Sequence, residues 1–296
     1  MAEDPVLFDR AAVRRHRDRA APEFDAHDFL HREVADRMAD RLADIRRTFP
    51  VAVNLGAAAP PVAGVEITAT LDLSAPLLSA RGAPGAVAAD DEFLPLASGS
   101  VDLAVSCLSL HWTNDLPGAL IQIRRALRSD GLFMAALLGG DTLIELRQAL
   151  MEAEAETTGG ARPRTSPVID VAEAGGLLQR AGFALPVIDT DTITVTFPDL
   201  FALLRDLRGM GETNALAAMR APLRRDTLVA AAARYAESYA DADGRIPATF
   251  QIVWLTGWAP ADGQQRALRP GSAAARLSDA LETEETPAGD KAAPGD

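Results

Sequence analysis

The sequence predicts an open, doubly wound α/β sheet in which most strands are parallel. Four short apolar runs have the length of strands and are bounded by turn residues, at 50–55, 65–71, 101–108 and 132–138. Continuous apolar runs of this kind are typical of parallel strands, because helices cover both faces of the sheet. Segments with helical periodicity alternate with these runs, which indicates successive strand–helix units.

The predicted helices have apolar residues at spacings of three and four. The first covers 28–49, where Asp28 is a suitable N-cap and a proline ends the pattern. Three more helices are expected at about 116–127, 142–156 and 171–181, each with glycine at or beyond its end. Helices in these positions would connect one strand of the sheet to the next.

The later part of the chain has a different pattern. Residues 187–197 alternate apolar and polar side chains, as an edge strand does, and 250–258 form a further strand. Helical stretches at about 198–207 and 222–238 lie between them. These stretches predict a helical insertion between the last two strands.

The expected organisation has three parts. An N-terminal helical segment covers 1–49, and the sheet domain covers 50–270 with its insertion at about 198–243. Residues 271–296 are rich in alanine, glycine, proline and acids, which is typical of a disordered acidic tail.

Composition limits the kinds of partner and compartment. The formal net charge is −13, which argues against a broad basic surface for nucleic acid or an anionic membrane. Cys107 is the only cysteine, so no intramolecular disulfide can form, and we expect it to be buried and inert. No signal peptide is recognisable and no apolar run reaches the ~20 residues of a membrane span. The default expectation is a soluble, cytoplasmic protein without a transmembrane segment.

Arginines crowd the N-terminus despite the acidic total. The simplest interpretation is a solvated helix face, and the alternative is a docking surface. The residues are Arg10, Arg14, Arg15, Arg17 and Arg19.

Candidate site residues are those that follow the predicted strands, because ligands of open α/β sheets bind outside the carboxyl ends of the strands. They come from the first strand, the second strand, the next turn and the fourth strand. In that order they are Asn54, Gly56, Asp72, Leu73, Asp90, Asp91, Ser106 and Leu108.

The chemistry of these residues suits a nucleoside. An acid at the end of the second strand, Asp72, can accept hydrogen bonds from two ribose hydroxyls. Asp90 or Asp91 can accept one from an adenine amino group, and Leu73 and Leu108 can enclose the base. The alternative for each acid is a simple turn former.

Several sequence runs resemble a known family. Leu108-Ser109-Leu110-His111-Trp112 and Gly209-Met210-Gly211 are specific to a subfamily, and the run from Asp90 to Pro95 is common to a whole superfamily. On these runs the chain resembles class I S-adenosylmethionine-dependent methyltransferases. The similarity is greatest to the complex I assembly factors that hydroxylate an arginine, and more distant to the biotin-pathway malonyl-carrier-protein methyltransferases.

The resemblance has implications for fold and function. It implies a Rossmann-like, seven-stranded sheet and S-adenosylmethionine as cofactor. It also implies methyl transfer to, or hydroxylation of, a protein or small-molecule acceptor, with a respiratory complex I subunit as a partner. Nucleic acid is not an expected partner.

The first loop departs from the family pattern, which has an acid at Asn54 and glycines at Ala58 and Pro60. Only eight residues separate Gly56 from Val65, where the second strand is expected to begin. A parallel crossover that contains a helix needs at least ~10–12 residues. We therefore expect the first crossover helix to be lost and cofactor binding to be weakened. The alternative function is a non-catalytic assembly factor or scaffold that kept the fold.

Histidines supply the remaining candidates. His111 follows the fourth strand and could act as a base or orient a substrate, or it could be purely structural. His27 and His31 have a spacing that can hold a metal, but no further histidine is near them, so no metal site is expected. The glycines at Gly209 and Gly211 predict a tight turn over the pocket or a plain turn between helices.

Overall fold

The computed structural model describes residues 6–169, 171–218, 222–265 and 276–283. Met1–Pro260 form one compact unit and Ala261–Asp296 form a second. Within the second unit, α9 (Leu277–Leu281) is a short helix. The rest of the predicted disordered tail beyond residue 271 lies mostly outside the described residues.

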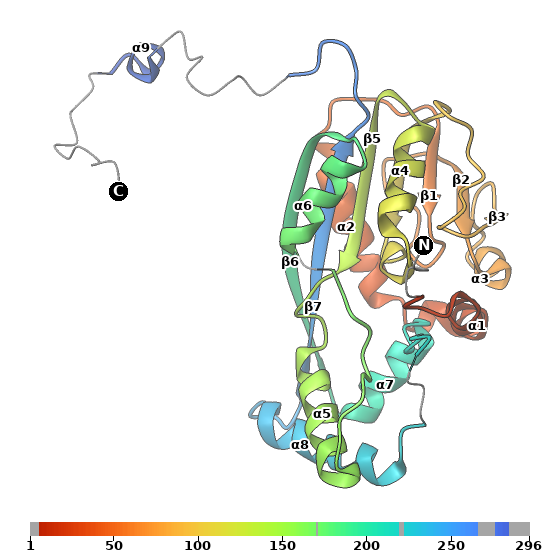
Figure 1. The fold of residues 1–296 in the computed structure, drawn as a ribbon, viewed down its shortest axis with the longest axis vertical. Coiled ribbons are helices and arrows are strands. Elements are labelled where there is room, and N and C mark those ends of the chain that lie inside the picture. Colours follow the sequence, from red (N-terminus) through yellow and green to blue (C-terminus); the bar gives the residue numbers. More distant parts are fainter. Residues whose placement is uncertain (1–5, 170, 219–221, 266–275, 284–296) are drawn as a thin grey trace, which may run out of the picture. The chain divides into compact units, whose positions relative to one another are not determined.

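The first unit contains a sheet of seven strands in the order β3-β2-β1-β4-β5-β7-β6 (Figure 1). The first five strands in this order pair in parallel, while β7 pairs antiparallel with both β5 and β6. The predicted fold is thereby confirmed, including β6 as an edge strand. The strands are β1 (Ala52–Leu55), β2 (Ile67–Asp72), β3 (Val87–Ala88), β4 (Val101–Cys107), β5 (Leu127–Leu138), β6 (Ala184–Phe197) and β7 (Ile246–Trp258).

Helices lie on both faces of the sheet, with α4 and α6 on one face and α2 on the other (Figure 1). The first two helical segments, α1 and η1, precede α2 and lie at the end of the sheet where α7 is also found. The helices are α1 (Arg10–Ala20), η1 (Ala21–Ala26), α2 (Phe29–Ala43), α3 (Ala75–Ala80), η2 (Leu110–Trp112), α4 (Leu116–Ala126), α5 (Ile144–Thr158), α6 (Val171–Arg180), α7 (Leu200–Gly209) and α8 (Arg225–Tyr239).

The sheet divides the apolar core into two clusters, one on each face, and the side chains of β5 contribute to both. Phe133 and Leu137 point into the cluster under α4 and α6, whereas Met134 and Leu138 point into the cluster with α2 and α5. Because successive side chains of a strand alternate between faces, both faces of β5 must be apolar. The continuous apolar runs of the sequence follow from this arrangement.

The crossover from β1 to β2 contains no helix, as its length predicted. Gly56 follows β1 with φ +109°, and its amide donates to the carbonyl of Leu71. A Cβ on Gly56 would lie 2.6 Å from the Cβ of Ser109, so only glycine fits. The next three residues, Ala57 to Ala59, are buried, and two of them pack with Phe24 and Leu77.

The insertion is also confirmed, since α7 and α8 lie between β6 and β7 in the chain. The predicted end of α2 is wrong, because the helix stops at Ala43 rather than at residue 49. Residues 44–50 instead form a non-helical turn that leads into β1. Among the described residues, no helix combines the length and apolar character that a membrane crossing requires.

Candidate functional site

The carboxylate of Asp72 at the end of β2 is fully buried and is bound by the protein itself. One oxygen accepts from Arg17 Nη1 at 3.0 Å and from the Ala57 amide at 2.9 Å, and the other accepts from the Ser74 amide. Arg17 lies on α1 and also donates to Ser109 Oγ at 3.0 Å. Burial alone lowers the pKa of Arg17, but the nearby carboxylates, Asp72 first, outweigh burial and raise it.

A second arginine of α1 engages the acids after β3. Arg10 donates to Asp90 at 2.6 Å and to the carbonyl of Trp112 at 2.9 Å, and it lies 3.5 Å from Asp91. Asp91 is buried, and its Oδ1 has no hydrogen-bond partner among the described residues. Burial raises the pKa of Asp91, and the charges of Arg17 and Arg10 oppose this shift.

The expected solvated face of arginines is therefore wrong for Arg10 and Arg17. Arg14, Arg15 and Arg19 are exposed, as expected. The periodicity of α1 does distinguish Arg17, which lies four residues after the buried Val13. Its burial is tolerated because its guanidinium donates to Asp72 and Ser109, and an unpaired buried charge would be far less stable.

The structure brings the predicted acids together but separates other predicted residues. Asn54 donates to the carbonyl of Gly56 at 2.9 Å, and Ser106 donates to that of Leu55, so both hold the backbone near β1. Leu73 packs beside the Phe8–Trp112 cluster. Leu108 belongs to a different cluster, on the side of α2.

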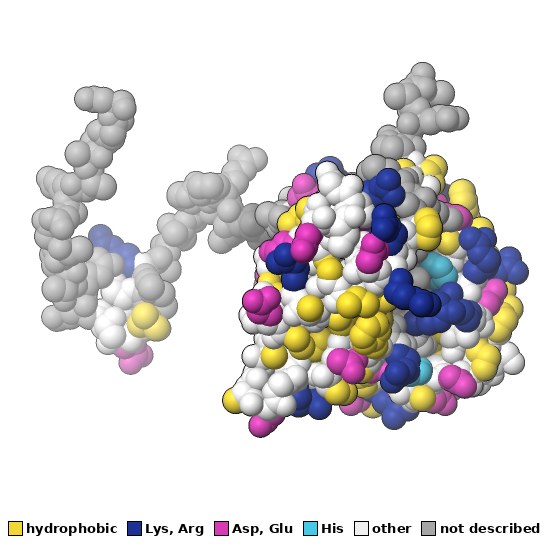
Figure 2. All heavy atoms as spheres, turned by 90° about the horizontal axis from the view of Figure 1, so that it is seen from below, with side chains coloured by type: hydrophobic (Ala, Val, Ile, Leu, Met, Phe, Trp, Pro, Cys, Tyr) yellow, Lys and Arg dark blue, Asp and Glu magenta, His cyan; other side chains and the backbone are white. Residues whose placement is uncertain are grey.

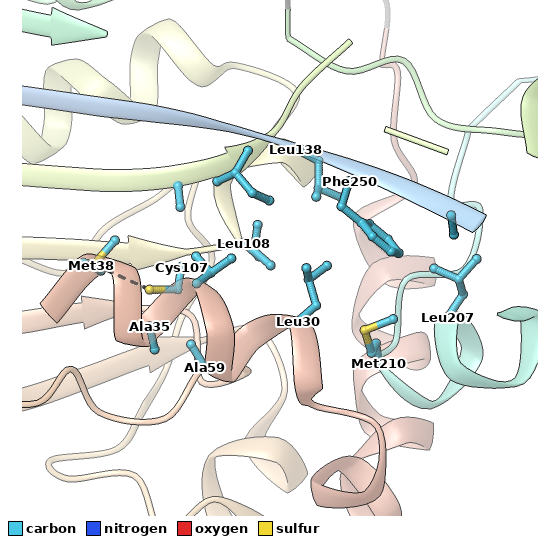
Figure 3. Packing of buried hydrophobic residues seen from close by; sticks show 14 of the residues in the cluster. Leu30, Ala35, Met38, Ala59, Cys107, Leu108, Leu138, Leu207, Met210 and Phe250 are labelled. Carbon is cyan, nitrogen blue, oxygen red and sulfur yellow. Dashed lines mark hydrogen bonds between the residues drawn. The ribbon is translucent and has the colours of Figure 1, made fainter. Parts of the chain in front are cut away.

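Leu108 lines a cavity of about 670 Å³ between the strand ends and the insertion. The walls come from α2, β5, α5, α7, β7 and the 163–168 segment, and most of them are apolar. Figure 3 shows six wall residues that point toward one another from four of these elements and the turns that follow β4 and α7. They are Leu30, Leu108, Leu138, Leu207, Met210 and Phe250.

One part of the cavity wall is polar and consists of His31, His111, Trp112 and Glu212. His111 Nε2 lies 3.1 Å from a carboxylate oxygen of Glu212, which also accepts from the indole of Trp112 at 3.0 Å. Burial alone raises the pKa of Glu212, but the contact with His111 and the nearby His31 and Arg17 together outweigh burial, and the pKa is lowered. Because a carboxylate only accepts, Nε2 of His111 carries the hydrogen of this contact.

Three ring nitrogens of this polar wall have no hydrogen-bond partner among the described residues. His31 is fully buried, and neither of its ring nitrogens has a hydrogen-bond partner among the described residues. Nδ1 of His111 is also buried without a partner in that part of the chain. Burial lowers the pKa of His31 to about 4, so its ring is neutral at pH 7. His27, by contrast, pairs with Asp206 at 2.8 Å and does not converge with His31 on a metal site.

The backbone beside the cavity is strained at two leucines. Leu108 has φ 52° and Leu143 has φ 53°, and both line the cavity. Residues other than glycine rarely adopt this left-handed region, and such strain concentrates at functional sites. Both of these residues lie in the wall of the cavity.

The strand order, the antiparallel final pair and the acids at the strand ends define the class of protein. The chain belongs to the class I S-adenosylmethionine-dependent methyltransferase superfamily, and residues 51–135 match the family described as methyltransferase domain. The YcgJ protein of Bacillus subtilis has the same fold, with a TM-score of 0.50 at 13% identity, covering 77% of this chain and 97% of that one.

Within this superfamily, the chain belongs to the family of the mitochondrial arginine-hydroxylase NDUFAF5. It is 42% identical over 285 residues to the Danio rerio protein of that name, covering 92% of this chain and 89% of that one. It is 45% identical to the Homo sapiens protein, covering 90% and 81%. The malonyl-[acyl-carrier protein] O-methyltransferase of Laribacter hongkongensis is 38% identical, with 89% and 94% covered.

These relatives overturn one expectation. The chain was expected to be cytoplasmic, but the NDUFAF5 relatives are named as mitochondrial proteins. The cytoplasmic default rested only on the lack of a recognisable signal in the sequence, and such a lack carries little information.

Membership of this superfamily implies S-adenosylmethionine, and the described residues fit it poorly in this conformation. A ribose needs carboxylate oxygens that it can reach at Asp72, but this carboxylate is fully buried and already accepts three hydrogen bonds, from Arg17, Ala57 and Ser74. Asn54 has a buried Oδ1 without a hydrogen-bond partner among the described residues, but it lacks the charge of the usual acid.

Proposed function

We propose that this protein is an S-adenosylmethionine-dependent enzyme that modifies an acceptor held at the polar wall of the cavity. The observation that carries the proposal is the pairing of Glu212 with Nε2 of His111, which leaves Nδ1 of His111 without a hydrogen-bond partner among the described residues. In the neutral ring this nitrogen is an acceptor. A carboxylate that orients a histidine is the usual arrangement of a general base.

In this proposal each residue has a distinct role. Glu212 fixes the tautomer of His111, and Nδ1 of His111 takes a proton from the acceptor. The apolar walls exclude water, which strengthens this hydrogen bonding. The names of the relatives point to arginine hydroxylation or to O-methylation, and we propose a subunit of complex I as a partner.

We further propose that Arg17 competes with the cofactor for Asp72. Titration calorimetry with S-adenosylmethionine tests this on three proteins: the unmodified chain, Arg17→Met and Asp72→Asn. We expect Arg17→Met to bind several-fold more tightly and Asp72→Asn to lose binding. If Arg17→Met loses binding as fully as Asp72→Asn, Arg17 is part of the cofactor site and not its competitor.

The second candidate function is a scaffold that kept the fold without catalysis. The missing first crossover helix favours it, because that helix would supply free amide groups to the cofactor. If Arg17→Met remains folded but gives no heat at millimolar cofactor, the scaffold is the better account. Folding is checked for each variant by thermal unfolding.

A further inference from the structure

We infer that exposed arginines at the mouth of the cavity bind an acidic segment of a protein acceptor, next to the residue that enters the cavity. These mouth arginines are Arg19 on α1 and Arg205 and Arg208 on α7. The inference rests on the proposed function, because it names the kind of acceptor that the same cavity receives. Binding of the acceptor requires neither cofactor nor turnover, so it can be measured separately.

The cavity opens to solvent beside these side chains. Arg208 and Asn214 line the cavity and are exposed, which places both at its opening. Arg19 donates to the hydroxyl of Thr213 at 2.9 Å, and Thr213 also lines the cavity. Arg205 lies one turn before Arg208 on α7 and extends the same face. Two helices that are far apart in the sequence therefore place arginines at one opening.

No carboxylate of the described residues forms an ion pair with the mouth arginines. Exposed arginines on other elements do find such partners, as Arg128 and Arg224 do with aspartates. Partial burial and the charge of Arg208 lower the pKa of Arg19, so the two guanidinium groups repel each other. The mouth thus has the opposite sign to the whole chain, whose formal charge is −13, and it favours an anionic partner.

An acidic peptide segment suits this surface. A guanidinium group binds a carboxylate through two parallel hydrogen bonds, and arginine clusters are a common means of recognising acidic motifs. Because the arginines come from two helices, several carboxylates along one segment can contact them at once. Figure 2 views the end of the molecule that carries α5, α7 and α8, where arginine side chains gather beside a hydrophobic patch. A segment with both acidic and apolar side chains fits such a surface.

The mouth makes the residues around the acceptor side chain a condition for binding. The ionised carboxylate of Glu212 is the only carboxylate of the cavity wall among the described residues, and it attracts a cationic acceptor. The mouth arginines repel the same cation as it enters. Acidic residues on either side of the acceptor offset this repulsion. The arrangement therefore admits a cationic side chain within an acidic segment and disfavours an isolated cation.

The first test measures peptide binding to the full chain without cofactor, by fluorescence anisotropy. Three labelled peptides of equal length share a central arginine with apolar neighbours, and their flanking residues are glutamates, glutamines or lysines. We expect the glutamate peptide to bind about tenfold more tightly than the glutamine peptide and the lysine peptide to bind most weakly. The net charge of the chain would by itself produce the reverse order. Added salt should weaken the glutamate peptide most.

The second test neutralises the mouth. The double variant Arg19→Gln/Arg208→Gln should bind the glutamate peptide about fivefold more weakly and the glutamine peptide equally well. Arg46→Gln/Arg125→Gln is the matched control, because it removes the same charge from exposed arginines that precede β1 and β5, at the opposite end of these strands. The control should leave both affinities unchanged. Thermal unfolding confirms that each variant is folded.

Several outcomes overturn the inference. Equal affinities for the glutamate and glutamine peptides, or no binding of any peptide, would show that the mouth does not recognise an acidic segment. An equal loss in the control variant, or tightest binding of the lysine peptide, would assign selection to the overall charge. None of these results alters the cofactor titration. Conversely, a failed cofactor titration leaves the peptide measurements intact, because they contain no cofactor.

Discussion

At the scale of single residues, His31 is the clearest departure from what stability alone favours. It is fully buried on the apolar face of α2 with two unpaired ring nitrogens. Since a leucine there would remove both unpaired groups, we expect His31→Leu to raise the free energy of unfolding by about 1–2 kcal/mol. Urea unfolding at pH 7, with Met38→Leu as control, measures this. A loss of stability would mean that the imidazole is paired in solution.

The pH dependence of stability tests the same residue. The pKa of His31 is about 4 in the folded protein and near 6.5 in the unfolded chain. Between these values the unfolded chain binds a proton that the folded protein does not, so stability falls as the pH falls. Relative to His31→Leu, the unmodified protein should lose roughly 3 kcal/mol between pH 7 and pH 4.

The charged groups that influence His31 are Glu212, His111, Arg17 and Asp28. They are present in both proteins, so their own titration largely cancels in the comparison with His31→Leu. A difference that does not change with pH would contradict the buried, neutral state of His31.

A further prediction at the scale of single residues concerns a side chain added at Gly56. Its φ of +109° and its contact with Ser109 leave no room for a side chain, so Gly56→Ala should lower the free energy of unfolding by roughly 2 kcal/mol or more. Gly64→Ala is the matched control, because Gly64 has φ +78° but no atom within 4 Å of the added Cβ. We expect the control to cost only about 1 kcal/mol. Equal losses would show that the contact with Ser109 is unimportant.

At the scale of elements, α1 covers the polar side chains that follow β2. Its Arg17 binds Asp72 after β2, and its Asp18 accepts a 2.6 Å hydrogen bond from Ser74 at the start of α3. A single helix thereby covers the edge at which class I methyltransferases hold their cofactor.

The burial of Arg17 predicts how strongly α1 is held. Arg17→Gln leaves the carboxylate of Asp72 buried without its charge partner, so the free energy of unfolding should fall by about 3–5 kcal/mol. Arg14→Gln and Arg15→Gln are matched controls on the exposed face, where the ion pairs are long and should contribute little. Chemical unfolding of the three variants measures these losses of unfolding free energy. If Arg17→Gln costs no more than the controls, α1 does not cover Asp72 in solution.

At the scale of the whole molecule, two regions meet around the cavity. The sheet contributes the ends of β4 and β5, while the insertion contributes α7 and the turn that carries Glu212. Glu212 and His111 are 101 residues apart in the chain. The Gly-Met-Gly run predicted only a turn, and Glu212 beside it contacts His111 because the insertion packs against the strand ends.

The sequence by itself determined the sheet, the insertion and the loss of the first crossover helix. Alternation, helical spacing and loop length are local properties, and burial on one or both faces produces them directly. Only the tertiary structure decided that Arg17 pairs with Asp72, 55 residues away, and that His31 and Glu212 line the same cavity. Ion pairs and buried polar groups depend on how whole elements pack together. Local sequence patterns do not contain this information.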